Sequence, residues 1–317
     1  MKNGLAEYLK VFCKKRVFVT TLIIINSLVI SGLSWAVSLH KILYIHDGEF
    51  VGQLCSVVPA KGMTPVCLAD GGYGSPSWRP HGNLIAAELK TRQGTKLVIL
   101  NKNGRLVRAL SKSKGCYRPE WSPDGRYLYA INYRLGHAIR RWNLESHRFK
   151  DIPVRGFGKE YSYLQGISFS PNYKRAAISV DKFKKILISD VYGDHFRVRK
   201  ILPGKFHYVA QSVWIDNDRL LFVGVKKNDD RGEIWQLNIG RGELWQLNVL
   251  TGKIKKISIR GLSLRDFVTL SPDHKSVVIC ATDNPQDPKW SLWLYKLGSP
   301  TATRITNGIE DVDPDWR

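Results

Sequence analysis

A short turn motif recurs along this chain at nearly constant intervals. Its best copy is Pro-Glu-Trp-Ser-Pro-Asp-Gly, at residues 119–125. Other copies, some of them weaker, lie at 76–82, 168–172, 213–217, 269–273 and 314–317. The aromatic or leucine positions of successive copies are separated by 43, 48, 45, 56 and 46 residues. A chain built from such units must fold as a repeat architecture, and a period of roughly 40–50 residues is typical of a β-propeller.

The motif itself predicts a turn between two strands. Proline presets φ, Asp or Asn hydrogen-bonds its own backbone, and glycine accepts a positive φ. The aromatic residue before the turn is expected to lie between neighbouring sheets. Short apolar segments follow every motif except the last, and Asn-Lys-Asn-Gly at 101–104 and Leu-Thr-Gly at 250–252 are hairpin signals between later strands. The sequence therefore predicts an all-β fold, a six-bladed β-propeller of four-stranded antiparallel blades.

The two ends of the repeat region complement each other. Segments 42–47, 52–58 and 64–69 supply a second, a third and a fourth strand without a first, whereas 312–317 supplies a first strand with nothing after it. Pairing these segments completes the sixth blade and removes exposed sheet edges. We therefore expect the N- and C-terminal strands to close the ring.

The motif at 119–125 resembles the repeat of TolB-like propellers, which are related to WD-repeat proteins and to the propellers of prolyl-oligopeptidase-type enzymes. The resemblance covers roughly residues 42–317. It implies the propeller fold and a peptide or protein ligand at the mouth of the axial channel. TolB proteins carry an additional α/β domain, and the peptidases an α/β-hydrolase domain; we expect neither here, because the N-terminal segment leads almost directly into the first strand.

The N-terminal segment predicts export. Residues 17–39 contain no charge, and Lys2, Lys10, Lys14, Lys15 and Arg16 precede them with Glu7 as the one acid. This pattern is typical of a transmembrane anchor with a cytoplasmic N-terminus. We therefore expect a cytoplasmic basic tail at 1–16, an anchor at 17–39 and a propeller at 40–317, in the periplasm of a bacterium with a single pass through the inner membrane. A cleaved signal peptide, with small residues at 34–38, and a buried helix of a soluble protein are alternatives.

The charge balance limits the class of partner. The chain has 49 Lys and Arg against 27 Asp and Glu, a net charge of +22. Such an excess attracts anionic partners. Outside the cytoplasm these are lipid headgroups, envelope polymers or acidic proteins, and the export signal argues against nucleic acid. A solvated basic surface without a specific ligand is the alternative.

Linear catalytic motifs are absent from the sequence. It contains no Gly-x-Ser-x-Gly, phosphate-binding glycine loop, His-Glu-x-x-His or Cys-x-x-Cys. We predict no catalytic residue, metal site or cofactor, although propeller enzymes often gather their residues from several blades. The acidic residues Glu310, Asp311, Asp313 and Asp315 are expected either to form ion pairs that hold the closing strand or to contact a cation or basic peptide.

The loops that enter the innermost strands are expected to form the channel mouth. The candidate ligand-binding residues there are Tyr117, Arg118, Gln165, Gln211, Asp266 and Asp313. They favour a membrane-anchored, non-catalytic module that binds a protein or peptide in the cell envelope. A hydrolase or lactonase with an axial site, and the sensor ectodomain of a degraded signalling protein, stay as alternatives.

Two local features complete the analysis. Cys55 and Cys67 flank a turn at 59–63 and are expected either to form a disulfide in an oxidising compartment or to pack as small apolar residues. Residues 231–240 are repeated almost unchanged directly afterwards, a ten-residue duplication that accounts for the longest interval. We expect both copies to be strands of a five-stranded blade; alternatively, one copy loops out, or the duplication has no role.

Overall fold

The computed structural model describes residues 41–47, 51–60, 63–135, 138–156, 164–180, 185–202, 206–210, 212–226, 242–286 and 288–316. All of them belong to the compact unit Lys41–Arg317, which is separate from the unit Met1–His40. In this described part the chain forms β-strands and turns, with a single 3₁₀ turn at Tyr133–Leu135. None of its helices is long and apolar enough to span a bilayer, and the predicted anchor at 17–39 lies outside the described residues.

The strands group into units of four, which we call blades 1 to 6. Blade 1 contains β24 (Val312–Trp316), β1 (Ile42–His46), β2 (Gly52–Val57) and the first half of β3 (Val66–Trp78). Blade 2 contains the second half of β3, β4 (Leu84–Thr91), β5 (Gly94–Asn101) and β6 (Leu106–Ala109). Blade 3 contains β7 (Cys116–Trp121), β8 (Tyr127–Asn132), β9 (Ala138–Asn143) and β10 (Phe149–Arg155).

The remaining blades follow the same order from the innermost to the outermost strand. Blade 4 contains β11 (Leu164–Phe169), β12 (Arg175–Val180), β13 (Lys185–Tyr192) and β14 (His195–Ile201). Blade 5 has an interrupted innermost strand, β15 (Phe206–Val209) and β16 (Val213–Trp214), then β17 (Arg219–Lys226), β18 (Glu243–Asn248) and β19 (Ile254–Ile257). Blade 6 contains β20 (Ser263–Leu270), β21 (Ser276–Thr282), β22 (Ser291–Lys296) and β23 (Ala302–Arg304).

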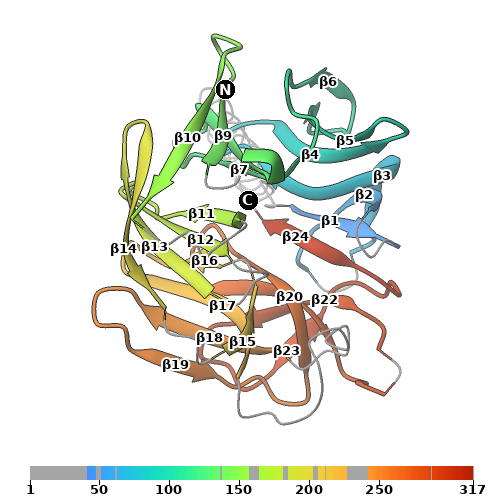
Figure 1. Ribbon diagram of the computed structural model, residues 1–317. Helices are drawn as coiled ribbons and strands as arrows, with labels where there is room; N and C mark the ends of the chain where they lie inside the picture. The colour runs from blue at the N-terminus through green and yellow to red at the C-terminus, as the bar shows by residue number, and fades with distance from the viewer. Residues whose placement is uncertain are drawn as a thin grey trace, which may run out of the picture. The chain divides into compact units, whose positions relative to one another are not determined.

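The innermost strands form a closed circuit. In order around it, β24, β3, β7, β11, β16 and β20 each contact the next, and β20 contacts β24 again. The closing strand β24 pairs antiparallel with β1, so that Trp316 lies opposite Ile42 (Figure 1, red beside blue). This is the pairing of chain ends that the sequence predicted. The Trp316 N–H also donates to Thr269 Oγ1 of blade 6 at 3.1 Å.

The aromatic and leucine positions of the motif are buried between neighbouring blades, as expected. Their exposed fractions are 8% for Trp78, 1% for Trp121, 7% for Phe169, 4% for Trp214, 7% for Leu270 and 8% for Trp316. The indole N–H of Trp121 donates to the Ser77 carbonyl of the preceding blade at 3.1 Å. A buried ring with its one polar atom satisfied contributes apolar area without leaving an unpaired donor.

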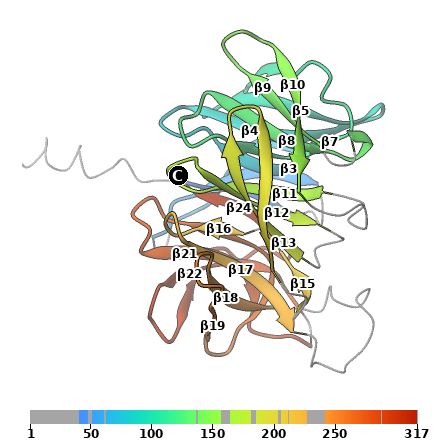
Figure 2. The ribbon, with the colours of Figure 1, turned by 60° about the vertical axis from the view of Figure 1, so that its left-hand side comes forward.

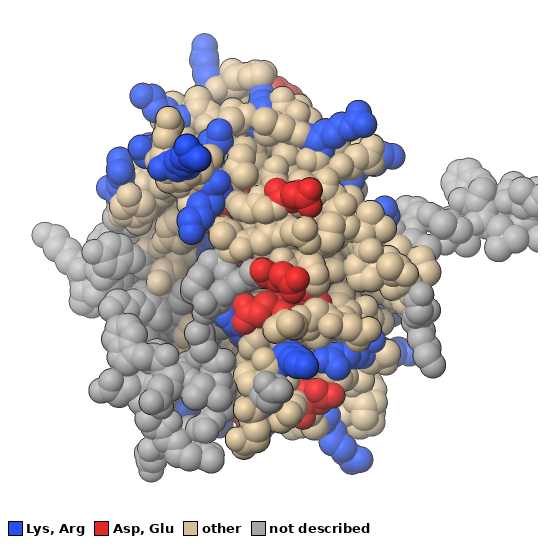
Figure 3. All heavy atoms as spheres, turned by 90° about the vertical axis from the view of Figure 1, so that its right-hand side faces the viewer, with Lys and Arg blue, Asp and Glu red and all other residues tan. Residues whose placement is uncertain are grey.

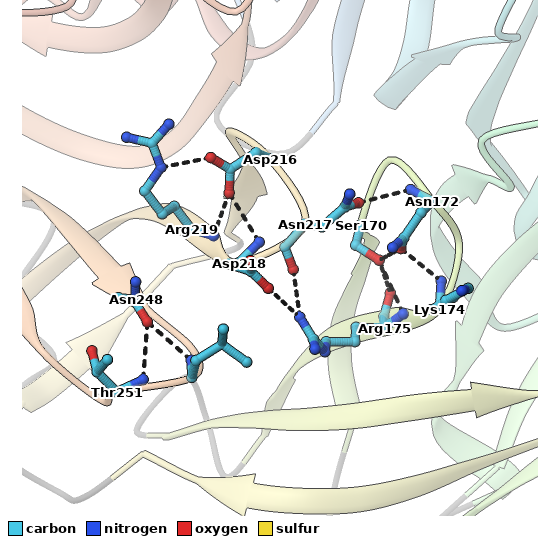
Figure 4. A network of polar contacts seen from close by, with 11 residues as sticks. Ser170, Asn172, Lys174, Arg175, Asp216, Asn217, Asp218, Arg219, Asn248 and Thr251 are labelled. Carbon is cyan, nitrogen blue, oxygen red and sulfur yellow. Dashed lines mark hydrogen bonds and ion pairs between the residues drawn. The ribbon is translucent and has the colours of Figure 1, made fainter.

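The turns at the far ends of the innermost strands bind one another from blade to blade. Figure 4 shows blades 4 and 5, where the Asn172 N–H donates to Asn217 Oδ1 at 3.0 Å. Arg175 Nη1 donates to the Asn217 carbonyl at 2.8 Å and pairs with Asp218 Oδ1 at 2.5 Å. The repeat motif therefore forms the turn of its own blade and also binds the turn of the neighbouring blade.

The duplicated segment differs from our expectation. The second copy provides β18, which pairs directly with β17 on one side and β19 on the other (Figure 2). The five-stranded blade, with the first copy between β17 and the second, is therefore wrong, because β17 and β18 are already hydrogen-bonded neighbours. The first copy, at 231–240, lies outside the described residues.

Candidate functional site

The innermost strands β3, β7, β11, β20 and β24 carry irregularities at equivalent positions. In each, pairing with the second strand of the blade shifts by one or two residues near the start of the regular run, at 75–76, 118–119, 165, 266–267 and 313–314. A β-bulge bends the strand and re-aims a side chain. The predicted mouth residues Arg118, Gln165, Asp266 and Asp313 therefore all lie in bulges. Arg118 and Asp313 stand three residues before the buried aromatic or leucine residue of their motif, and Gln165 and Asp266 stand four before theirs.

Three of the bulge residues adopt a left-handed backbone conformation. The φ angles are 41° for Ser75, 54° for Arg118 and 51° for Asp313. Each is followed by the first proline of the repeat motif. A positive φ at a residue other than glycine costs energy and is concentrated at functional sites. Six other described residues besides glycine have a positive φ, all of them outside strands. Ser75, Arg118 and Asp313 differ because they lie within strands.

Arg118 reaches across the axis of the ring. It belongs to β7, whereas Phe267 belongs to β20, and these strands lie three places apart in either direction around the circuit. The Arg118 Cζ nevertheless lies 4.8 Å from the centroid of the Phe267 ring. The Arg118 backbone N–H donates to Glu88 Oε1 at 2.8 Å, which fixes the start of the side chain. A cation–π contact therefore joins opposite sides of the circuit of innermost strands, at the level of the bulges.

Ser75 and Asp313 meet on another part of the mouth. The Ser75 N–H donates to Asp313 Oδ2 at 3.1 Å, and its hydroxyl donates to the same oxygen at 3.3 Å. Both residues are partly exposed. Asp313 thus joins blades 1 and 2 and stays partly exposed.

Tyr117 and the remaining candidates are placed as follows. The Tyr117 hydroxyl donates to the Leu164 carbonyl of blade 4 at 2.8 Å. Burial raises the pKa of Tyr117 to about 12, so the phenol is neutral at physiological pH. Gln165 is partly exposed in the β11 bulge. Gln211 lies outside the described residues, and for Asp266 the structure describes only the backbone within β20.

The acidic residues before β24 connect the chain ends. Arg265 Nη1 of blade 6 pairs with Glu310 Oε1 at 3.0 Å. His46 Nδ1 of blade 1 lies 2.6 Å from Oδ1 of the buried Asp311, whose Oδ2 accepts the Gly308 N–H at 2.9 Å. The interpretation that these acids hold the closing strand is therefore supported for Glu310 and Asp311.

Other partners in this region had no sequence signal. Glu88 lies in the middle of β4 and His46 ends β1, and nothing in the repeat distinguishes them. The packing of blades 2 and 3 brings Glu88 to Arg118, and the closure of the ring brings His46 to Asp311. In the described part of the chain, no three His, Cys, Asp or Glu side chains are grouped to hold a metal ion.

Cys55 and Cys67 form a disulfide across β2 and β3. The two residues are direct register partners in the antiparallel pair. The remaining described cysteines, Cys116 and Cys280, are buried and take no part in a disulfide.

The positive charge of the chain is distributed unevenly. On the face shown in Figure 3, Lys and Arg side chains spread over the upper and lower parts, and Asp and Glu side chains gather near the middle. The excess charge is therefore not a single uniform patch on that face.

Comparison with solved structures identifies the fold. A crystal structure of TolB from Acinetobacter baumannii matches with a TM-score of 0.66 and 16% identity, over 87% of this chain and 66% of its own. A hydrazine synthase of Kuenenia stuttgartiensis matches with 0.50 and 15%, over 75% and 68%. An oligogalacturonate lyase in complex with manganese matches with 0.51 and 10%, over 83% and 71%.

No family model matches the chain, and no curated protein matches its sequence. The structural matches at 10–16% identity show a TolB-like β-propeller fold. This chain covers 66% of the TolB chain, about two thirds of its length. Because one fold hosts many functions, activity has to be argued from the mouth itself.

Proposed function

We propose that this chain is an extracytoplasmic, membrane-anchored, six-bladed β-propeller that binds a protein or peptide at the mouth of its axial channel. The observation that carries the proposal is the set of matching bulges, in which Ser75, Arg118 and Asp313 are held in left-handed conformations. Strained, partly exposed polar residues on a rigid scaffold are typical of binding sites.

The chemistry of the mouth suits a polypeptide. Arg118 offers a guanidinium donor, Asp313 a carboxylate acceptor and Phe267 an aromatic face. A peptide presents backbone N–H and C=O groups together with apolar side chains, so it can use all three. The proposal takes no catalytic step, because it requires only hydrogen bonding and apolar contact.

The extracytoplasmic placement of the propeller is argued from features other than the mouth. The charge-free segment at 17–39 and the basic residues before it favour an anchor with the propeller outside the cytoplasm. A disulfide between Cys55 and Cys67 is compatible with an oxidising compartment. Mass spectrometry of the protein purified without reductant measures this directly: a bonded pair is expected, and two free thiols would contradict it.

The binding test compares the two ends of the innermost strands. Affinity capture from a solubilised envelope extract is carried out with the intact chain, with Arg118→Ala and Phe267→Ala, and with the control Lys174→Ala. Lys174 is exposed in the turn at the far end of β11, and its replacement by alanine removes one positive charge, as Arg118→Ala does. We expect a stoichiometric polypeptide that the control retains and the mouth variants lose. Equal retention by every variant would refute the mouth as the site.

A further inference from the structure

The outer edges of blades 3 and 4 are joined by a parallel strand pair. The last residues of β10 pair with the first residues of β14, Val154 opposite Phe196 and Arg155 opposite Arg197 (Figure 1). Among the described strands, every other pairing is antiparallel. This seam merges the two blades into one eight-stranded sheet.

The seam places two arginines side by side. Val154 and Phe196 are buried, with exposed fractions of 5% and 1%. Because side chains alternate along a strand, Arg155 and Arg197 both project from the other face, and both are exposed. Their strands are separated by about 4.8 Å, the usual spacing of paired strands.

Within the described part of the chain, neither arginine has a carboxylate partner. The acid opposite Arg197 on β13 is Asp190, but Asp190 Oδ2 is bound by Arg199 Nε and accepts the Tyr192 hydroxyl at 3.2 Å. Asp190, the acid in register with Arg197, is therefore already engaged by Arg199 and Tyr192.

Several other basic side chains on the same blades are paired with carboxylates. Arg140 binds both carboxylate oxygens of Asp151, at 2.7 and 2.8 Å. Arg141 pairs with Asp194 at 2.9 Å, and Lys150 pairs with the second oxygen of that carboxylate. Arg155 and Arg197 differ from these side chains, because they are exposed register partners and no described carboxylate binds either of them, so their donors are available to a ligand.

The geometry of the pair selects the kind of anion. A guanidinium is a planar fork of donors, and a single fork already satisfies a planar carboxylate in a bidentate contact. A phosphate group carries more charge and has further acceptor oxygens, so it accepts two adjacent forks. We propose that Arg155 and Arg197 form a binding site for a phosphate group, at the seam and separate from the axial mouth.

The test measures binding of inorganic pyrophosphate to the intact, detergent-solubilised chain by calorimetry. The variant Arg155→Gln/Arg197→Gln is compared with Arg105→Gln, which removes an exposed arginine on blade 2. We expect the double variant to lose at least about tenfold in affinity, because charge-assisted hydrogen bonds are removed, and the control to bind like the intact chain. An equal loss in the control would overturn the site.

A lipid source of the phosphate is tested with the same variants. Vesicles of phosphatidylglycerol replace pyrophosphate, with phosphatidylcholine vesicles as the uncharged reference. Loss of vesicle binding in the double variant alone assigns the site to a headgroup, and loss of pyrophosphate binding alone assigns it to a soluble phosphate. If neither probe distinguishes the double variant from Arg105→Gln, the proposal is wrong.

Arg155→Lys/Arg197→Lys separates charge from geometry. The double lysine variant keeps both charges and therefore the same long-range attraction to anions, but it lacks the planar guanidinium groups that bind two oxygens at once. We expect intermediate affinity and an unchanged melting temperature. Affinity equal to that of the intact chain would reduce the site to nonspecific attraction and contradict the proposal.

Discussion

The Ser122 hydroxyl organises the turn of the best-preserved repeat. It accepts the Tyr127 N–H at 3.0 Å and donates to Asp124 Oδ1 at 2.6 Å, and Asp124 in turn accepts the Arg126 N–H at 3.1 Å. Gly125 completes the turn with a φ of 68°. These bonds stay within six residues, which is why the turn is readable from the sequence alone.

The Trp121 ring contributes at the same scale through burial. Trp121→Ala is expected to lower the free energy of unfolding by about 3–5 kcal/mol, because it leaves a cavity and unpairs the Ser77 carbonyl. Chemical denaturation followed by circular dichroism measures the change. Tyr133→Ala, at a site 51% exposed, is the control and should change stability little. An equal loss of stability in both variants would contradict the conclusion that the buried Trp121 ring stabilises the packing of neighbouring blades.

Asp273 links a repeat turn to pH. The Ser271 hydroxyl and then the Lys275 N–H stabilise its carboxylate and hold its pKa below the usual value. A lowered folded-state pKa stabilises the protein at neutral pH, and the contribution disappears as pH falls through that pKa. Asp273→Asn, which copies Asn172 in blade 4, should therefore melt below the intact chain at pH 7 and approach it near pH 3. Parallel melting curves across this range would contradict the assignment.

At the scale of strands and blades, the sequence predicts which segments form strands, but it predicts only some of the pairings and contacts between them. The order of strands follows from turn residues and apolar runs, which are local. The two copies of the duplication carry nearly the same residues, so no local pattern decides which one pairs with β17. The mouth positions were predictable because they lie where the chain enters each innermost strand, a few residues before the repeat motif. The Arg118–Phe267 contact was not, because it depends on two side chains from opposite blades.

The pairing of β18 leads to a prediction for the duplication. Deleting residues 231–240 should leave a folded propeller, because β18 keeps its pairing with both β17 and β19. The melting temperature and the near-ultraviolet circular dichroism should stay close to those of the intact chain. A matched deletion of ten residues across β21 and its turn, 273–282, should abolish folding. If both deletions unfold the protein, the repeat alignment in blade 5 is wrong.

At the scale of the whole propeller unit, stability depends on joining blade 6 to blade 1. Glu310 pairs with Arg265 of blade 6, and Asp311 contacts His46 of blade 1, so consecutive residues clamp the two sides of the closure. The strand β24 then supplies the innermost position of blade 1. Closure of this kind leaves no exposed inner edge.

Removing the last six residues, 312–317, should open the ring. We expect a large drop in melting temperature, because β1 and β20 both lose their contacts with β24. The control is Ile309→Ser, which changes an exposed residue just before this segment. It should melt at the same temperature as the intact chain. A truncated protein with unchanged melting would show that β24 does not close the fold.

The proposal that the axial mouth binds a polypeptide is tested most directly by site-specific photo-crosslinking in intact cells. A photoreactive phenylalanine analogue is placed at Phe267, where the ring faces Arg118 across the channel, and separately at Lys174 at the far end of the blades. We predict a discrete cross-linked polypeptide from position 267 and none from position 174. The same product from both positions, or none from position 267, would contradict the proposal.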